Sequence, residues 1–345
     1  MPLLQVNTPL AFDAEADLLG SGTVGEVFRV TLGLPNAKPR APPRVFALKR
    51  YFSREGRDDF ANERNTLESL AVPAPHAAIV YHLSSWIADT ASYMLFPLAS
   101  GDLHRFLHTE PPPNEITADI AAPLLDRVHG LLDALRFIHD SGVLRLPEYP
   151  RPVRRIGFHH DLKPANVLIF QDNAGRTHWK LGDFGSGTAR FVPAEFHEEL
   201  YNRKASTGDP VYSAPEFAVD GRVSSPKDIW SMGAVLLEVL VWARGTSIAE
   251  VQRFEAARLE FREETMENAA LYWCQSPAGG LPYLNPAVET ELDKIALRST
   301  HVRSRHSFFW LLQGLYVECW HLSRRFGLPQ LNFANIWRNS SLPLN

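Results

Sequence analysis

The chain has 345 residues, of which 45% are hydrophobic and 21% charged, and its formal net charge at pH 7 is −4. This composition can bury a core large enough for two lobes or domains, and it gives no general attraction to nucleic acid. The longest apolar run, Ala234–Ala243, contains Glu238 and is too short to span a bilayer. We therefore expect a buried core helix there and no membrane segment.

The sequence also predicts the cellular setting. No N-terminal stretch combines basic residues, an apolar run and a small-residue cleavage site. The two cysteines, Cys274 and Cys319, lie far apart and follow neither a metal-binding nor a disulfide pattern. We expect an intracellular chain, cytoplasmic or nuclear, in a reducing compartment, and a monomer.

The first part of the chain has a mostly β pattern. After a leader over residues 1–17, strands are predicted over 26–32 and 44–52, with a Pro-rich connector over Gly33–Arg44 between them. One helix is predicted over Arg57–Leu70. Helical spacing places three apolar residues on one of its faces, namely Phe60, Leu67 and Leu70.

The second part is mainly helical. A helix is predicted over Pro123–Gly142, closed by its glycine, and a hairpin over Val167–Gly185. Most segments from Ser225 onward, including residues 307–326, have helical patterns. Because a small β-rich half precedes a larger helical half, a ligand cleft between the two is the expected place for chemistry.

A glycine-rich loop begins the β-rich half. Gly20, Gly22 and Gly25, followed by Val27, have the spacing that lets backbone N–H groups approach phosphate oxygens without an intervening Cβ. An isolated match of this kind is more often a hairpin that binds nothing. A strand rather than a helix is predicted to follow. The pattern therefore favours a loop folded over a nucleotide and not a dinucleotide-binding turn.

Lys49 lies on the second predicted strand, and Ala47 shares its face. A surface lysine is the plain alternative. However, a small residue beside an adenine ring and an amine that reaches the phosphates would need this arrangement. Glu63 is the expected partner of the ammonium, because it follows Phe60 by three residues near the inward face of the predicted helix. Glu68 on the same helix is the competing candidate.

The stretch "HHDLKPAN" (His159–Asn166) supplies a second polar group. Asp161 can accept a hydrogen bond from an attacking hydroxyl, and Lys163 can neutralise charge on a transferring phosphoryl group. The amide oxygen of Asn166 can bind magnesium, which prefers oxygen ligands. Asp183, at the end of the predicted hairpin, supplies a second such oxygen. A carboxylate there is ordinarily a turn residue, but its place after this stretch favours the metal role.

Taken in order, these motifs resemble those of the eukaryotic protein kinases over about residues 18–320. The stretches "APE" (Ala214–Glu216) and "DIWSMG" (Asp228–Gly233) add to the resemblance. It implies an α+β fold with two lobes, a small β-rich N-lobe with one helix and a larger, mainly helical C-lobe. The expected boundaries are a leader over 1–17, the N-lobe over 18–97, the C-lobe over 98–320 and an extension over 321–345.

The resemblance also implies cofactors and contacts. ATP and Mg²⁺ are the expected cofactors, and the adenine would lie between Val27 and Ala47 on one side and Leu168 on the other. Lys163 is typical of members directed at serine and threonine. Some motifs, including the "FPLASGDL" stretch over 96–103, are similar to those of kinases common in filamentous fungi.

Two structural pairs follow from the same resemblance. The "HHDLKPAN" stretch (His159–Asn166) corresponds to the family's catalytic loop. Asp228 is expected to brace the backbone of this loop from a buried helix. Glu216 is expected to pair with a late arginine, either Arg305 or, as the alternative, Arg303.

Two residues depart from the family pattern. His160 stands where the family usually has an arginine that pairs with a phosphorylated activation segment, so we expect activity that does not strictly require such phosphorylation. Asp209 stands where a threonine usually bridges the catalytic Asp and Lys. A second carboxylate near Asp161 costs electrostatic energy unless Lys163 or a metal compensates, so slow catalysis or an unusual substrate is an expected consequence.

An inserted basic stretch, "LRLPEYPRPVRR" (Leu144–Arg155), lies between His139 and the catalytic loop. Its default interpretation is a solvated, disordered insertion. The alternative is that one of its arginines binds an acidic substrate or a phosphorylated loop in place of the missing arginine; the candidates are Arg145, Arg151, Arg154 and Arg155. The histidines, with His108 and His129 among them, show no metal-ligand spacing.

The leading prediction is a protein kinase that transfers the γ-phosphate of ATP to Ser or Thr hydroxyls of protein substrates, with no nucleic-acid or membrane partner. Its predicted catalytic residues are Asp161, Lys163, Lys49 and Glu63. A pseudokinase scaffold that binds nucleotide without efficient turnover is the alternative, favoured by Asp209 and His160. A small-molecule kinase would share the Asp, Asn and metal Asp, but "APE", "DIWSMG" and the position of Lys163 speak against it.

Overall fold

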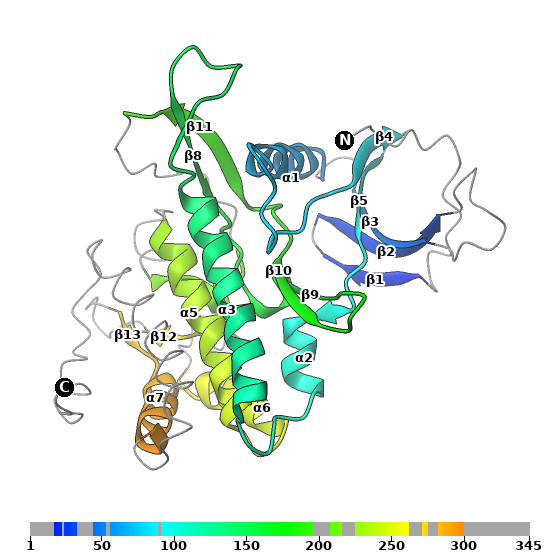
Figure 1. Ribbon diagram of the computed structural model, residues 1–345. Coiled ribbons are helices and arrows are strands. Elements are labelled where there is room, and N and C mark those ends of the chain that lie inside the picture. The colour runs from blue at the N-terminus through cyan, green and yellow to red at the C-terminus, as the bar shows by residue number, and fades with distance from the viewer. Residues whose placement is uncertain are drawn as a thin grey trace. The chain divides into compact units, whose positions relative to one another are not determined.

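The computed structural model describes residues 17–22, 24–32, 44–52, 56–88, 91–195, 208–215, 225–261, 271–274 and 282–299 (Figure 1). Most of the predicted leader and connector, the helix predicted over 307–326 and the extension over 321–345 lie outside these residues.

The chain divides into two compact units. One contains the residues up to Asp102 together with 129–159 and 166–198; the other contains 103–128, 160–165 and the residues from 199 onward. Helix α3 (Ala118–His139) contributes to both units. The lobe boundaries expected from the sequence stay a prediction.

The first unit contains an antiparallel five-stranded sheet in the order β1-β2-β3-β5-β4 (blue to cyan in Figure 1). Its buried face holds a cluster of Phe28, Val30, Leu48 and Leu95, each at most 1% exposed. Both strands expected from the alternating pattern are confirmed. The bounds are β1 Leu18–Ser21, β2 Gly25–Leu32, β3 Arg44–Tyr51, β4 Ser84–Ala88 and β5 Ala91–Pro97.

The register of the sheet sets which side chains share its other face. Val27 lies opposite Lys49, and Arg29 lies opposite Ala47. Directly opposed residues of an antiparallel pair point to the same side. Val27, Ala47 and Lys49 therefore lie on the face away from the buried cluster.

Helix α1 (Gly56–Leu70) follows β3, as the sequence predicted. The apolar stripe expected on one face is confirmed, because Phe60, Leu67 and Leu70 are all buried. Phe60 meets the ring of Tyr51 edge to face, with 5.4 Å between the centroids. This contact fixes α1 beside the strand that carries Lys49.

Two small antiparallel sheets complete the first unit. The predicted hairpin is confirmed as β9 (Val167–Gln171) and β10 (Thr177–Leu181). The short β6 (Gly101–Asp102) pairs with β9 as the third strand of this sheet. The other sheet has the order β11-β8-β7. Its strands are β7 Val143–Leu144, β8 Val153–Phe158 and β11 Thr188–Pro193.

The structure describes the whole inserted basic stretch, which includes the end of β7 and the start of β8, and this corrects the default expectation of disorder. Arg155 lies on β8, is fully buried, and donates hydrogen bonds to the carbonyls of Val72 and Phe137, near the C-termini of α1 and α3. Arg154 pairs with Asp140. Local patterns do not show this, because Arg155 bonds to Val72, 83 residues away, and Arg154 to Asp140, 14 residues away.

Helix α3 begins five residues before the predicted start at Pro123 and ends at His139, three residues before Gly142. A proline lacks an N–H and crowds only the carbonyl four residues earlier. Here that carbonyl belongs to Asp119, in the first turn, and α3 continues through the proline although Pro123 cannot bond to it. Gly142 has φ +68°, a conformation that favours glycine, in the turn that follows.

The second unit is built around helix α5 (Ser225–Arg244), whose residues from Trp230 to Ala243 are almost all buried. The expected core helix is thus confirmed, and no helix of the described residues is long and apolar enough to cross a membrane. Its buried Glu238 accepts hydrogen bonds from Tyr212 and Tyr272. The other elements are α2 Leu103–Thr109, η2 Pro210–Tyr212, α6 Ala249–Leu259, β12 Trp273–Cys274, β13 Tyr283–Leu284 and α7 Pro286–Ser299.

Replacing Arg155 by methionine should lower the free energy of unfolding by about 3 kcal/mol, because buried carbonyls at two helix ends lose a charged donor. Urea denaturation measures this. The matched control, Arg151→Met, removes an exposed arginine of the same stretch and should change stability by less than about 0.5 kcal/mol. Equal effects of the two substitutions would contradict a clamping role for Arg155.

Candidate active site

Lys49 is the centre of a charged group in the first unit. Its Nζ lies 2.7 Å from Oε2 of Glu63 on α1 and 2.8 Å from Oδ1 of Asp183, two residues beyond the end of β10. The side chains of Lys49 and Glu63 are 11% and 1% exposed, whereas that of Asp183 is 48% exposed. A buried ammonium is thus held between a buried carboxylate and one that is open to solvent.

The charges of this group reinforce one another. Burial alone would lower the pKa of Lys49, but the attraction of Asp183 and Glu63 outweighs it and raises that pKa well above its ordinary value. Lys49 in turn holds the pKa of the Asp183 carboxyl down to about 2, mainly through its positive charge. Both groups are therefore charged at neutral pH.

The structure pairs Lys49 with Glu63 and not with Glu68. Glu63 also accepts a hydrogen bond from the hydroxyl of Tyr51, at 2.5 Å. Glu68 is on the exposed side of α1, where its carboxylate lies 3.9 Å from Arg64. Glu63 thus lies on the same inward face of α1 as Phe60.

The backbone at Asp183 is unusual. Asp183 has φ +56°, in a left-handed region that few residues other than glycine adopt. A Cβ on Gly185 would lie 3.4 Å from Oδ1 of Asp183, so glycine leaves space beside this oxygen. The Asn62 amide on α1 donates to the carbonyls of Gly185 and Gly187, at 2.9 and 2.7 Å. Helix α1 therefore holds the segment after Asp183 as well as Lys49.

The three glycines of the β1–β2 turn are not equivalent. A Cβ on Gly25 would lie 2.2 Å from the carbonyl oxygen of Arg50, so the packing of β2 on β3 itself requires glycine there. A Cβ on Gly20 would have nothing within 4 Å, and one on Gly22 only the Gly25 carbonyl at 4.0 Å. The protein's own packing does not require glycine at these two positions.

The structure places the remaining predicted residues of this unit as follows. Val27, Ala47 and Leu168 are half-buried apolar side chains on β2, β3 and β9. Asn166 is 6% exposed, and its carbonyl accepts a hydrogen bond from the N–H of Gly182 at 2.9 Å. This bond joins Asn166 to the residue that immediately precedes Asp183.

The second unit contains the other charged group. Nζ of Lys163 lies 3.0 Å from Oδ2 of Asp161 and 3.8 Å from Oδ2 of Asp209. The backbone N–H of Asp209 donates to Oδ1 of Asp161 at 2.7 Å. A lysine and a backbone N–H thus offset the repulsion that the sequence predicts between the two carboxylates.

A buried helix holds the backbone of the catalytic loop. Oδ1 of Asp228 on α5 accepts the N–H of His160 at 2.8 Å, and Nζ of Lys227 donates to the His160 carbonyl at 2.9 Å. The brace expected from Asp228 is confirmed. His160 has φ +70° and is 1% exposed, and a Cβ on Gly208 would lie 2.4 Å from its carbonyl oxygen.

Sequence analysis missed three residues that hold this arrangement, namely Tyr51, Asn62 and Lys227. Only Lys227 had a visible signal, because it immediately precedes Asp228 in the chain. The expected pair of Glu216 with Arg305 or Arg303 lies outside the described residues.

Replacing Lys49 by methionine should lower the free energy of unfolding by about 3–5 kcal/mol, because Glu63 is left buried without its cation. Urea denaturation measures this, and Lys180→Met, at a half-buried lysine of another strand, is the control. If both substitutions have the same small effect, the buried ion pair does not stabilise the fold.

The same Lys49→Met variant should raise the pKa of Asp183 from about 2. A lowered carboxyl pKa stabilises the fold above the unfolded value of 3.8 and loses this effect as the pH falls through about 2. In carboxyl ¹³C NMR between pH 3 and 5, Asp183 should stay ionised in the wild type and titrate in the variant.

Comparison with known proteins places this sequence in a family. The sequence profile described as "Protein kinase domain" matches residues 14–269. Among similar proteins, L-type lectin-domain containing receptor kinase V.5 of Arabidopsis thaliana is 28% identical, with 67% of this chain and 30% of that protein aligned. Cell division control protein 2 homolog 3 of Trypanosoma brucei brucei is 29% identical over 66% of this chain and 61% of its own length.

Serine/threonine-protein kinase VIK of Arabidopsis thaliana is 28% identical, with 66% of this chain and 45% of that protein aligned. The chain therefore spans less than two thirds of the length of these relatives. The profile match runs from before the glycine-rich turn to beyond α6 and includes every predicted site residue. By this match and by its α+β fold, the chain belongs to the protein kinase family.

Proposed function

We propose that this protein transfers the γ-phosphate of ATP to serine or threonine hydroxyls of protein substrates. The observation that carries the proposal is the buried ammonium of Lys49, held at 2.7 Å by Glu63 and at 2.8 Å by Asp183. An ammonium held in one place on a rigid strand can bind phosphate oxygens without first losing side-chain freedom.

ATP is assigned to the face of the sheet that carries Lys49. The register puts Val27 and Ala47 on that face, where half-buried apolar side chains can cover an adenine ring. Gly20 and Gly22 support the assignment, because the fold does not need glycine at either position, whereas close approach of phosphates does. Leu168 is proposed as the apolar contact on the opposite side of the ring.

Protein kinases generally use Mg²⁺, and the oxygen donors of this unit suit that ion. Asp183 offers a half-exposed, ionised carboxylate. Asn166 offers a side-chain amide oxygen, and its backbone carbonyl is hydrogen-bonded to the N–H of Gly182, the residue before Asp183. These two residues would hold magnesium, which would supply charge neutralisation on the phosphates. The space that Gly185 leaves beside Asp183 fits this assignment.

Asp161 is proposed to accept the hydrogen bond of the attacking hydroxyl and to orient it in line. Lys163, at 3.0 Å from Asp161, would offset the negative charge that develops on the transferred group. Because the chemistry of phosphoryl transfer is loose, positioning and charge neutralisation supply most of the catalysis.

We also propose that activity does not require a phosphorylated activation segment. His160 replaces the arginine that would bind the phosphate, and its side chain is buried at 1% exposure. Its backbone N–H already donates to Asp228, and its carbonyl already accepts from Lys227. Protein substrates, a monomeric state, an intracellular location and the similarity to fungal kinases stay predictions from the sequence.

One observation favours the pseudokinase as a second candidate. Lys163 lies near two carboxylates, at 3.0 Å from Asp161 and 3.8 Å from Asp209. A lysine whose charge is shared in this way offers less of it to a phosphoryl group. Nucleotide binding without turnover would select this function.

In the wild type, transfer of labelled γ-phosphate from Mg-ATP to the protein itself or to a generic basic protein should be measurable. Asp161→Asn should reduce it by about 10²–10⁴-fold, because the hydroxyl loses its acceptor carboxylate. Removing Mg²⁺ with a chelator should also abolish transfer. Asp172→Asn, in the exposed β9–β10 turn, is the matched control and should keep full activity.

The outcomes separate the two candidate functions. Transfer that is lost in Asp161→Asn and kept in Asp172→Asn supports the kinase. Equal transfer by the wild type and Asp161→Asn would refute the role of Asp161. No transfer by the wild type, with ATP still bound, would support the pseudokinase and direct the next experiment to Asp209→Thr.

Gly22→Ala should weaken ATP binding while leaving the free energy of unfolding nearly unchanged, because its Cβ meets only one protein atom, at 4.0 Å. Gly25→Ala should instead destabilise the fold, because its Cβ would lie 2.2 Å from a backbone oxygen. Calorimetric ATP titration and urea denaturation of both variants measure the contrast. Unchanged ATP affinity in Gly22→Ala would contradict a phosphate-binding role for this turn.

A further inference from the structure

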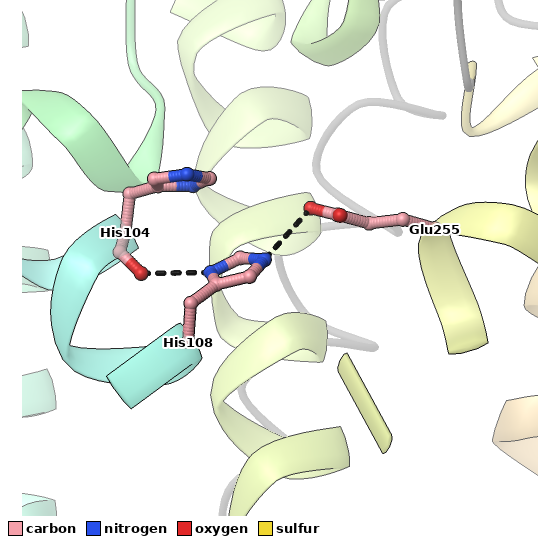
Figure 2. Close-up of side chains that lie close together, drawn as sticks. All are labelled: His104, His108 and Glu255. Atoms are coloured by element: carbon pink, nitrogen blue, oxygen red, sulfur yellow. Dashed lines mark hydrogen bonds and ion pairs between the residues drawn. The ribbon is translucent and has the colours of Figure 1, made fainter. Parts of the chain in front are cut away.

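We propose that His104, His108 and Glu255 form a binding site for a divalent transition metal ion, with Zn²⁺ as the best-fitting one. One potential ligand atom from each residue lies within 4.8 Å of the other two. Figure 2 shows both imidazoles on one side of α2 and the carboxylate reaching toward them from α6. The proposed phosphoryl transfer uses none of these residues.

The two histidines occupy adjacent turns of one helix. Residues four apart on a helix lie on the same face, and two histidines at this spacing are a recurrent zinc-binding arrangement. Their ring centroids are 4.2 Å apart. The expectation that the histidines lack metal-ligand spacing is therefore wrong for His104 and His108. The third ligand, Glu255, is far away in the sequence and comes close only through the fold.

The hydrogen bond of His108 determines which of its nitrogens can bind a metal. Nδ1 lies 2.8 Å from the carbonyl oxygen of His104, which can only accept, so Nδ1 carries a proton. In the neutral ring Nε2 then has the free lone pair, and a hydrogen bond from the other nitrogen is typical of metal-binding histidines.

The surroundings of Nε2 call for a cation. It lies 3.3 Å from Oε1 of Glu255, yet it is buried and has no hydrogen-bond partner among the described residues. A lone pair and a carboxylate oxygen facing each other repel unless a positive species lies between them. That species is either a proton on Nε2 or a metal ion that binds both atoms.

The packing of α2 keeps this geometry in place. Phe106 on α2 contacts Trp242 of α5, with 4.9 Å between ring centroids. Nε1 of Trp242 donates to the carbonyl of Glu110, just after the end of α2, at 2.9 Å. Since α2 and α6 both pack on α5, the two elements that carry the ligands have a common support. A site built on packed helices loses little freedom when a metal binds.

The donor set and exposure select the metal. Two imidazole nitrogens and one carboxylate oxygen suit Zn²⁺, Cu²⁺ or Ni²⁺ and not Mg²⁺, which prefers oxygen alone. Zn²⁺ binds such ligands at about 2.0–2.2 Å, which brings tetrahedral ligand atoms to about 3.4 Å from one another. The ligand atoms, which lie within 4.8 Å of one another, would therefore have to come closer together. The exposed His104 can make this movement without disturbing the core. A water molecule would complete the coordination.

The test uses the full chain without a polyhistidine tag, freed of metal and kept in excess Mg²⁺. Zn²⁺ is titrated against a chromophoric chelator, and the bound ion is examined by X-ray absorption. We expect one saturable Zn²⁺ per chain with Zn–N distances of about 2.0–2.1 Å and no sulfur ligand at about 2.3 Å. Both His104→Gln and Glu255→Gln should lower the affinity at least tenfold.

Matched controls distinguish the loss of a metal ligand from the general effect of removing a histidine or a carboxylate elsewhere. His178→Gln removes an exposed histidine on β10, and Glu250→Gln removes a carboxylate on the same helix as Glu255. Both should leave Zn²⁺ affinity unchanged, and circular dichroism checks that every variant is folded. No saturable binding by the wild type, or equal binding by wild type and His104→Gln, would overturn the proposal and leave a proton between His108 and Glu255.

Discussion

The ion pairs of Lys49 are the interaction on which the arrangement of the first unit depends. One ammonium joins β3 to α1 through Glu63 and to the end of β10 through Asp183. A buried charge without partners is costly, so the structure is more stable when these elements meet at this point. The bonds from Asn62 to Gly185 and Gly187 extend the constraint to the following segment. The fold and the candidate phosphate site therefore share one set of contacts.

Backbone strain marks the same places. Among the described residues, His160 and Asp183 are the only ones other than glycine with positive φ. Such conformations persist where surrounding contacts over-determine them, and they concentrate at functional sites. His160 is held by Asp228 and Lys227 from α5, and Asp183 by Lys49. The two predicted catalytic motifs thus each contain one strained residue with fixed surroundings.

Charged residues that look alike in the sequence have different roles in the structure. The four arginines of the inserted stretch form one basic run, yet Arg155 is buried against helix carbonyls while Arg151 is exposed. His104 and His108 have a metal-binding spacing on one helix, but only the fold brings Glu255 beside them. In both cases the role of the residue depends on a group that is remote in the sequence, and local sequence patterns cannot reveal such a contact.

The sequence by itself indicated the family, the β-rich first part, the mainly helical second part and a set of predicted site residues. It could do so because glycine spacing, strand alternation, the "DLKPAN" motif and Asp183 at the end of the predicted hairpin are local and chemically specific signals. Only the tertiary structure decided that Lys49 pairs with Glu63 and not Glu68, and that Lys163 lies between Asp161 and Asp209. Pairing of charges depends on which side chains are buried together, and burial is a property of the packed chain.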